Sequence, residues 1–218
     1  MNKTKIPWAD YTINPVKGLC PMACDYCYAR RMYKRFKWNP EIHLMSRWGA
    51  ELPYIKPSKI FVGSTMELFG SWIPDEWLEK IFLTIKLESQ HTFIFLTKQP
   101  QNLIKWSPFP ENCWVGVSAT NHEMAFNASC NLIPIKAKVK YISFEPLLGH
   151  IVPAVLNLLL KQIQWLIIGC QTPISAKTLP KREWVTDIIT AADQVQIPVF
   201  VKEPMASYLN IQRREFPG

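Results

Sequence analysis

The sequence predicts an α/β fold in which a parallel sheet forms a partial (β/α) barrel of six to seven βα units. Apolar, β-rich runs alternate with segments of helical period along the whole chain. A crossover helix is the usual connection between neighbouring parallel strands. No Gly-x-Gly-x-x-Gly turn is present to indicate a dinucleotide-binding fold. The length of 218 residues suits one domain, and we expect residues 1–218 to form a single barrel domain.

The predicted elements follow one another in a regular order. Seven segments have the composition of strands: 11–15, 59–64, 92–98, 113–119, 140–147, 164–170 and 197–203. Six segments between them are predicted to be helical: 26–37, 74–89, 100–106, 121–132, 151–162 and 181–195. The helix at 74–89 has the clearest pattern, because a proline is tolerated in its first turn and apolar residues then recur at helical spacing. Residues 39–57 contain three prolines and are expected to form a loop with irregular helix.

Composition and charge limit the class of protein. Hydrophobic residues make up 48% of the chain and charged residues 19%, which is typical of a globular protein. The N-terminal stretch lacks the apolar run of a signal peptide, and no segment reaches about 18 consecutive apolar residues. We therefore expect a cytoplasmic protein without a membrane partner. The net charge of +8 leaves room for an anionic partner such as a nucleic acid, a nucleotide or an acidic protein.

A basic segment follows the first cysteines. Its cations lie on one predicted helix: Arg30, Arg31, Lys34, Arg35 and Lys37. Such a face is either solvated or in contact with nucleic acid, and the sequence leaves both interpretations open.

Three of the six cysteines lie in the short stretch from Leu19 to Arg31. Cys20, Cys24 and Cys27 have the spacing C-x3-C-x2-C. Thiolates are soft ligands that suit zinc or the iron of an iron–sulfur centre. No fourth ligand lies nearby in the sequence, and three ligands with one open position predict a reactive centre. A zinc-stabilised loop is the alternative; a disulfide knot does not suit so few cysteines in a chain of this length.

The cysteine spacing, with the aromatic Tyr26 just before the third cysteine, resembles the cluster-binding loop of the radical S-adenosylmethionine (SAM) enzymes. In that family three cysteines hold three irons of a 4Fe-4S cluster, and the amino and carboxylate groups of SAM chelate the fourth iron. Reduction of the cluster cleaves SAM to a 5′-deoxyadenosyl radical, and a flavodoxin or ferredoxin supplies the electron. The resemblance implies that Cys20, Cys24 and Cys27 are metal ligands and that Tyr26 lies at the cofactor.

Polar residues follow nearly every predicted strand. In a βα barrel the carboxyl ends of the strands form the active-site rim. The residues at these ends are Ser64, Thr65, Glu67, Thr97, Lys98, Ser118, Asn121, Glu145, Gly169, Cys170, Lys202 and Glu203. Each follows a run that is apolar enough to be core, so we expect a polar rim that also contains the cysteine loop.

The resemblance also implies roles at the second strand. Radical SAM enzymes often carry Gly-Gly-Glu there to bind the SAM amino group. This chain has Gly-Ser-Thr-Met-Glu instead, so backbone carbonyls and the Ser64 or Glu67 side chain would bind it. The expected contacts in this stretch are Gly63, Ser64, Thr65 and Glu67.

Other strand ends receive roles in the same way. Ser118 and Glu145 are placed to contact the carboxylate or ribose of SAM, although an acid at the rim could instead pair with a neighbouring lysine. Lys98 could pair with a carboxylate or a substrate phosphate, and Lys202 is a further catalytic candidate. Cys170 is either a small buried hydrophobe or a hydrogen-atom donor, as a cysteine is in the radical SAM lyase that repairs spore photoproduct in DNA.

A closer resemblance extends over nearly the whole length. The blocks WADYTINPVKGLCPMACDYCYARR, FVGSTMELF, YISFEPLLG and WLIIGC, in this order, resemble the phage-related Gp37/Gp68 family of radical SAM-like proteins, a DUF5131-type domain. That family has no settled reaction. This chain departs from it at 169–173, where Gly-Gly-Glu-Ser-Gly is common, and at 202–205, where Lys-Gln-Trp-Gly is usual. Both departures fall at the expected substrate side and leave room for a different substrate.

The prediction is thus a radical SAM enzyme with a 4Fe-4S cluster and SAM as cofactors. The net charge, the basic segment and the phage association favour a nucleic acid or nucleotide as substrate. One alternative is a non-enzymatic, zinc-stabilised nucleic-acid-binding protein. Another is a degenerate barrel that keeps its cluster but senses redox state or binds a nucleotide.

Overall fold

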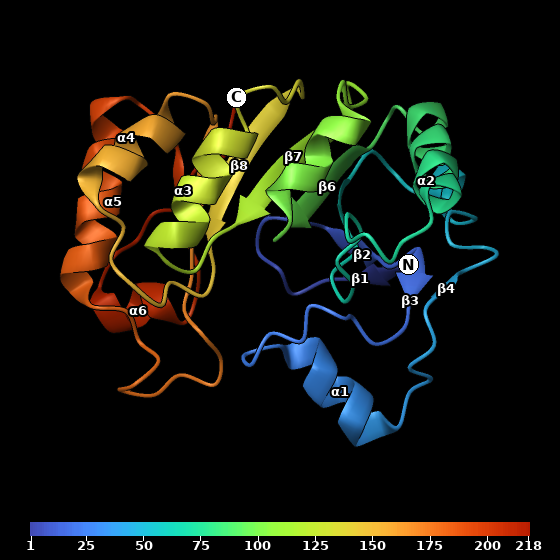
Figure 1. Ribbon diagram of the computed structural model, residues 1–218, viewed down its shortest axis with the longest axis horizontal. Helices are drawn as coiled ribbons and strands as arrows, with labels where there is room; N and C mark the ends of the chain where they lie inside the picture. Colours follow the sequence, from blue (N-terminus) through green and yellow to red (C-terminus); the bar gives the residue numbers. More distant parts are fainter.

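The computed structural model describes residues 1–218 and shows a mostly parallel sheet with helices packed against it (Figure 1). The strands of this sheet are β1 (Asn2–Lys3), β2 (Tyr11–Ile13), β5 (Lys59–Val62), β6 (Thr92–Thr97), β7 (Cys113–Ser118), β8 (Val139–Phe144), β9 (Trp165–Ile168) and β10 (Val199–Val201). Within this sheet the strands from β2 onward are all parallel and lie in sequence order. At one edge, β1 pairs antiparallel with β2. The edge strands β1 and β10 do not pair with each other, so the barrel is partial, as predicted.

A helix lies in each crossover from β5 onward. These helices are α2 (Asp75–Leu87), the 3-10 helix η2 (Pro100–Trp106), α3 (His122–Asn131), α4 (Pro153–Leu160) and α5 (Arg182–Gln194). The remaining helices are α1 (Tyr28–Phe36), which follows the cysteine loop, the 3-10 helix η1 (Leu52–Tyr54) and α6 (Met205–Leu209). Figure 1 shows α1 apart from the other helices, beyond the strand ends. None of the helices has the length and apolar character needed to cross a membrane.

The two faces of the sheet are packed differently. The outer face and the crossover helices share a core of 46 buried residues, mostly aliphatic. The inner face carries a separate cluster rich in aromatic rings: Trp8, Phe61, Ile94, Trp114, Val139, Tyr141, Trp165, Ile167 and Phe200. Successive side chains of a strand point to opposite faces, so these two clusters fix which residues point into the barrel.

The ring of Tyr141 fills the inner side of the sheet. A Cβ atom on Gly116, the neighbouring residue on β7, would lie only 2.2 Å from this ring, so only glycine leaves room for it. The Tyr141 hydroxyl donates a hydrogen bond to the carbonyl of Phe95 at 2.8 Å. The interior below the rim is therefore a packed floor of side chains.

The predicted strands and helices are confirmed, with ends that differ by at most three residues. The residues 100–106 form a 3-10 helix. Three features were not predicted: β1, α6, and the two-stranded sheet of β3 (Val16–Lys17) and β4 (His43–Leu44). The strands among them are only two residues long, which is too short for a local period to mark them.

Candidate active site at the strand ends

The cysteine loop lies at the rim formed by the carboxyl ends of the strands. Cys27 is the N-cap of α1, and its Sγ accepts a hydrogen bond from the backbone N–H of Arg30 at 3.4 Å. Ala23 has a left-handed backbone with φ of 49°, which turns the chain between the first two cysteines. The loop is held to the body because the hydroxyl of Tyr28 donates to the carbonyl of Ser64 at 2.7 Å, beyond the end of β5.

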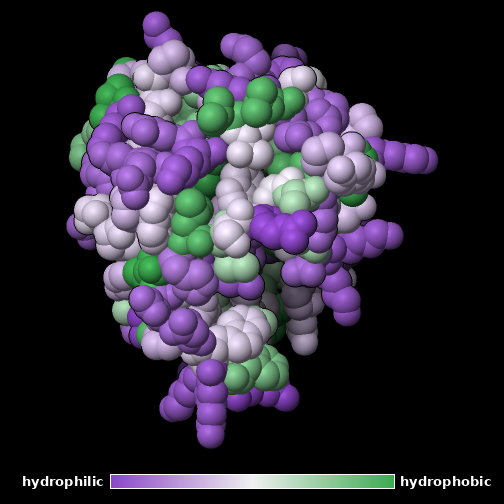
Figure 2. All heavy atoms as spheres, turned by 90° about the vertical axis from the view of Figure 1, so that its right-hand side faces the viewer, coloured by the Kyte–Doolittle hydropathy of each residue, from purple (hydrophilic) through white to green (hydrophobic).

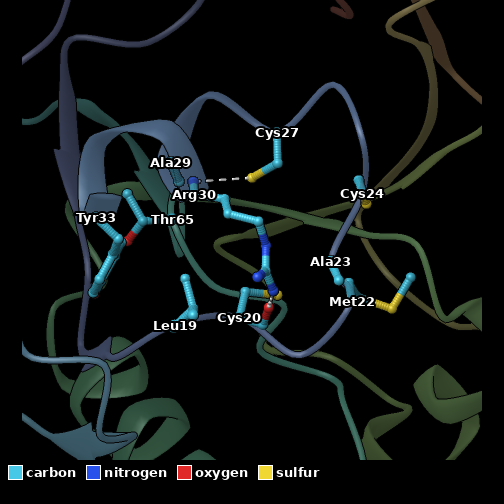
Figure 3. A pocket seen from close by; sticks show the side chains of 10 residues that line it. All are labelled: Leu19, Cys20, Met22, Ala23, Cys24, Cys27, Ala29, Arg30, Tyr33 and Thr65. Carbon is cyan, nitrogen blue, oxygen red and sulfur yellow. Dashed lines mark hydrogen bonds between the residues drawn. The ribbon is translucent and has the colours of Figure 1, made fainter. Parts of the chain in front are cut away.

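The residues of all three cysteines line one small hollow that is partly open to solvent. Figure 3 shows Cys20, Cys24 and Cys27 on different sides of it, with Arg30 reaching across. The Arg30 guanidinium donates to the carbonyl of Cys20 at 2.9 Å and so brings a fixed positive charge to the loop. Burial raises the pKa of the Cys20 thiol, although the backbone N–H of Glu67 opposes this shift.

The donor set of this hollow suits an iron–sulfur cluster. Thiolate sulfur is a ligand of a single zinc ion as well as of cluster iron, and no three His, Cys, Asp or Glu side chains of the structure are grouped to hold a metal ion. A cluster of four irons takes each thiolate on a different iron, so its ligands stand further apart. The three thiols that line the hollow supply the ligand types that such a cluster needs.

Tyr26 and Lys98 lie together beside the loop. The Lys98 Nζ is 5.9 Å from the centroid of the Tyr26 ring, within range of a cation–π contact. The Tyr26 hydroxyl lies near Thr120 and Cys24, and burial raises its pKa above the usual range. The structure thus brings together Tyr26, which the sequence placed in the cysteine loop, and Lys98, which it placed at a strand end.

The turn after β5 is shaped by Gly63 and held by Asn14. Gly63 has a positive φ of 78°, and a Cβ atom there would lie 2.6 Å from the Leu68 side chain. The Asn14 side chain bonds the Ser64 hydroxyl, and its Oδ1 accepts from the backbone N–H of Thr65 at 3.2 Å. Thr65 also lines the cysteine hollow. This turn therefore joins the end of β2 to the loop.

Glu67 is held inside the protein. Its exposed fraction is 8%, and its carboxylate accepts hydrogen bonds from the Thr97 hydroxyl and the backbone N–H of Lys98, both at 2.7 Å. Burial raises the pKa of Glu67, while these hydrogen bonds oppose the shift. Its carboxylate oxygens are therefore engaged by the protein, and its backbone is the part that lies close to Cys20.

Glu145 and Lys202 form an ion pair across the ends of β8 and β10. Gly169 lies between them, since a Cβ atom on it would lie 3.1 Å from Glu145 and 3.4 Å from Lys202. The Ser118 hydroxyl donates to the backbone carbonyl of Glu145 at 3.2 Å. The alternative of a rim ion pair with a lysine is thus what the structure shows for Glu145. The pair still leaves both side chains partly exposed, at 27% and 18%.

Cys170 points away from the barrel interior. It belongs to the outer-face core, and its exposed fraction is 8%. Burial raises the pKa of its thiol, the nearby Glu145 raises it further, and Lys202 lowers it. The thiol therefore lies near the ion pair but behind the strand, in the surroundings of a buried small hydrophobe.

Four residues at this rim were not predicted from the sequence: Asn14, Tyr28, Arg30 and Ser143. Asn14 follows the first predicted strand directly, so its position was a usable signal. Ser143 lies on β8 opposite Ser118, and its buried hydroxyl has no hydrogen-bond partner within the protein. A buried hydroxyl without a partner is costly, and this one lies on the inner face, directly below the rim.

Comparison with known proteins places the chain in a sequence family and a fold. The family model described as "Protein of unknown function (DUF5131)" matches residues 3–213. No curated protein matches the chain in sequence.

Solved structures of spore photoproduct lyase have the same fold. A tyrosine-to-phenylalanine mutant has a TM-score of 0.63 at 14% identity, and a cysteine-to-serine mutant 0.61 at 14%. A double mutant with bound AdoMet and dinucleoside spore photoproduct has a TM-score of 0.53 at 12% identity. In each case the match covers 92% of this chain and 78% of the lyase chain.

Proposed function

The chain belongs to the DUF5131 family, and we propose that it is a radical SAM enzyme whose 4Fe-4S cluster is held by Cys20, Cys24 and Cys27. One observation carries the proposal. The three thiols line a single hollow at the carboxyl rim of a parallel sheet, on a fold similar to that of a lyase solved with bound AdoMet. When bound, a cluster with SAM at its open iron would supply the reductive cleavage of SAM.

Residues of the cysteine loop and of α1 would hold the cluster and stabilise its charge. Cys20, Cys24 and Cys27 are the thiolate ligands, and the backbone N–H of Arg30 stabilises negative charge on Cys27 through its hydrogen bond. The positive charge of the Arg30 guanidinium partly offsets the negative charge of the three thiolates. Tyr28 fixes the loop against the β5 turn, which keeps the ligands at the rim.

SAM is proposed to lie between the cysteine loop and the inner-face polar groups. In the β5 turn, Thr65 borders the hollow, so its side chain is assigned contact with an amino group. The carbonyls of Gly63 and Ser64 accept hydrogen bonds from Met66 and Tyr28, so only their second lone pairs would be free to bind it. Glu67 supports this turn and Lys98 through its hydrogen bonds, so we assign it positioning and not direct contact.

The far side of the proposed SAM site is formed by polar groups of β7 to β10. The Ser143 hydroxyl has no partner within the protein and can donate to a carboxylate or a ribose oxygen. The Ser118 hydroxyl donates to the Glu145 carbonyl, so it can accept from a ribose hydroxyl. Glu145 can accept from ribose hydroxyls while Lys202 balances its charge. Tyr26 and Lys98 close the side next to the loop.

The substrate is proposed to be a nucleic acid or a nucleotide. The net charge of +8 supports an anionic substrate, and the spore photoproduct lyase of the same fold was solved with a dinucleoside photoproduct. Lys98 and Lys202 would meet its phosphate or a developing charge, and Cys170 would act as a hydrogen donor only if its strand end opened. A cytoplasmic flavodoxin or ferredoxin is the proposed electron donor. We also propose that the chain is related to the phage Gp37/Gp68 proteins.

Metal content and spectroscopy test the proposal directly. Anaerobic reconstitution with iron and sulfide should give about four irons and four sulfides per chain. The reduced protein should show an electron paramagnetic resonance signal that changes when SAM is added. Cys24→Ala should lose the signal, whereas Cys130→Ala, an exposed cysteine outside the loop, should keep it. One tightly held zinc per chain with no uptake of iron would overturn the proposal in favour of a zinc-stabilised binding protein.

A further inference from the structure

The distal half of α1 and the two residues that follow it carry a basic and aromatic surface that the proposed chemistry does not use. We call it the α1 surface. Its residues are Lys34, Arg35, Phe36, Lys37 and Trp38, all of which are exposed. The lower end of Figure 2, where α1 lies, shows long hydrophilic side chains that project into solvent beside paler and green ones.

The positive charge of the α1 surface is not neutralised within the protein. No acidic residue occurs from 26 to 40, and none of the seven ion pairs in the structure involves α1. A merely solvated helix usually mixes acids and bases at spacings of three or four residues, because such pairs stabilise it. Like charges at these spacings cost stability. A bound polyanion would remove this cost.

Two aromatic rings lie on the same surface and face solvent. Phe36 is 51% exposed and Trp38 is 42% exposed. Their rings are stacked, with centroids 5.6 Å apart and planes 22° apart, and the Arg35 guanidinium lies 5.3 Å from the Phe36 centroid. Trp38 also packs edge-on against the buried ring of Tyr33, which fixes its direction. The pair is therefore a preformed flat apolar face with cations around it.

We propose that the α1 surface binds single-stranded nucleic acid. Exposed aromatic rings give nucleobases a stacking platform, and the neighbouring lysines and arginine bind the phosphates; this combination is how proteins hold single strands without reading their sequence. An acidic protein partner would use the charges but has no need of two stacked, exposed rings. Unpaired bases, unlike the stacked bases of a duplex, can reach these rings.

The surface also has a useful position relative to the rim. From Cys27, which lies in the cysteine hollow, nine residues at about 1.5 Å each place Phe36 about 13 Å away along the helix. A strand held there would extend over a few nucleotides to the open side of the hollow. The extension of the strand to the hollow rests on the proposed function. Binding to the α1 surface itself needs neither cluster nor SAM.

Fluorescence anisotropy with a labelled 15-nucleotide oligothymidylate tests the binding on the full chain at low salt. The double variant Phe36→Leu, Trp38→Leu keeps apolar side chains but removes both rings, and we expect its affinity to fall at least tenfold. Tyr54→Leu is the matched control, because Tyr54 is 88% exposed and lies outside α1. Its affinity should stay within twofold of the parent chain. Circular dichroism of each variant checks that the helices are retained.

A charge variant gives a second, independent readout. Lys34→Glu with Lys37→Glu should weaken binding, and the slope of log affinity against log salt should become shallower by about 0.7 for each phosphate that the variant no longer neutralises. The control is Lys136→Glu with Lys161→Glu, which changes the net charge by the same amount. Both residues are exposed and lie outside the α1 surface, shortly before the amino ends of β8 and β9. This control should bind as the parent chain does.

Three results would overturn the inference: no binding of the oligonucleotide, equal losses in the α1 and control variants, or equally tight binding of polyglutamate of the same length. None of them bears on iron content or SAM cleavage. Failure of the α1 surface and failure of the proposed chemistry can therefore be told apart.

Discussion

Gly116→Ala tests whether the floor below the site is packed as described. The added Cβ would lie 2.2 to 2.4 Å from three atoms of the Tyr141 ring, where carbon atoms normally stay about 3.5 to 4.0 Å apart. Tyr141 is fully buried, and its ring packs against Trp165 at 5.3 Å. A shift of the ring large enough to relieve this overlap would stretch or break its hydrogen bond to Phe95.

The magnitude follows from these two effects. Overpacking costs about 1 to 3 kcal/mol and the broken hydrogen bond about 1 kcal/mol. The free energy of unfolding should therefore fall by about 2 to 4 kcal/mol, which lowers Tm by about 5 to 15 °C for a chain of this length. Calorimetry of the variant measures this. Gly149→Ala is the control, because the nearest atom to its added Cβ is 3.8 Å away. A Tm within about 2 °C of the parent, or an equal fall in Gly149→Ala, would refute the packing argument.

Three further predictions concern the rim and its surroundings. Lys202→Met leaves a partly buried carboxylate unpaired and should cost about 1 to 2 kcal/mol of unfolding free energy by urea titration; a double variant that also neutralises the partner should recover part of it, and no recovery would contradict the pairing. Burial raises the pKa of Cys113 to about 12, so at pH 8 iodoacetamide should alkylate the exposed Cys130 and spare Cys113, as peptide mass spectrometry would show; equal rates would be inconsistent with this burial. The hydrogen bonds of Arg213 lower the pKa of Asp193, so the folded chain binds that proton less readily than the unfolded chain. This contribution to stability is present above about pH 4 and is lost as pH falls through the lowered pKa. Arg213→Met should flatten the decline of Tm between pH 5 and 2, and an unchanged profile would argue against it.

The βα order could be predicted because each long element carries its own period. The strands from β5 to β10 are apolar runs that end at polar residues, and the outer helices have one apolar face. The short elements could not be predicted in this way. The strands β3 and β4 form through a partner more than twenty residues distant, and α6 has only five residues.

The sequence predicted which residues follow the strands and so lie at the rim. It did not predict in which direction each of their side chains points. The alternation of β9, continued past its last residue Ile168, directs Cys170 outward, and the packing of Cys170 in the outer-face core agrees with this. The hydrogen bonds of Glu67 depend on the approach of the β5 turn to the end of β6, which no local pattern reveals. The Glu145–Lys202 pair likewise depends on two strand ends that are 57 residues apart in sequence.

The formation of 5′-deoxyadenosine is the most direct test of the proposed chemistry. The reconstituted chain is incubated anaerobically with dithionite and SAM, and the product is followed by chromatography beside Cys24→Ala and Cys130→Ala. We expect 5′-deoxyadenosine from the parent chain and from Cys130→Ala, and none from Cys24→Ala. A chain that takes up no iron and releases no 5′-deoxyadenosine would contradict the proposed chemistry.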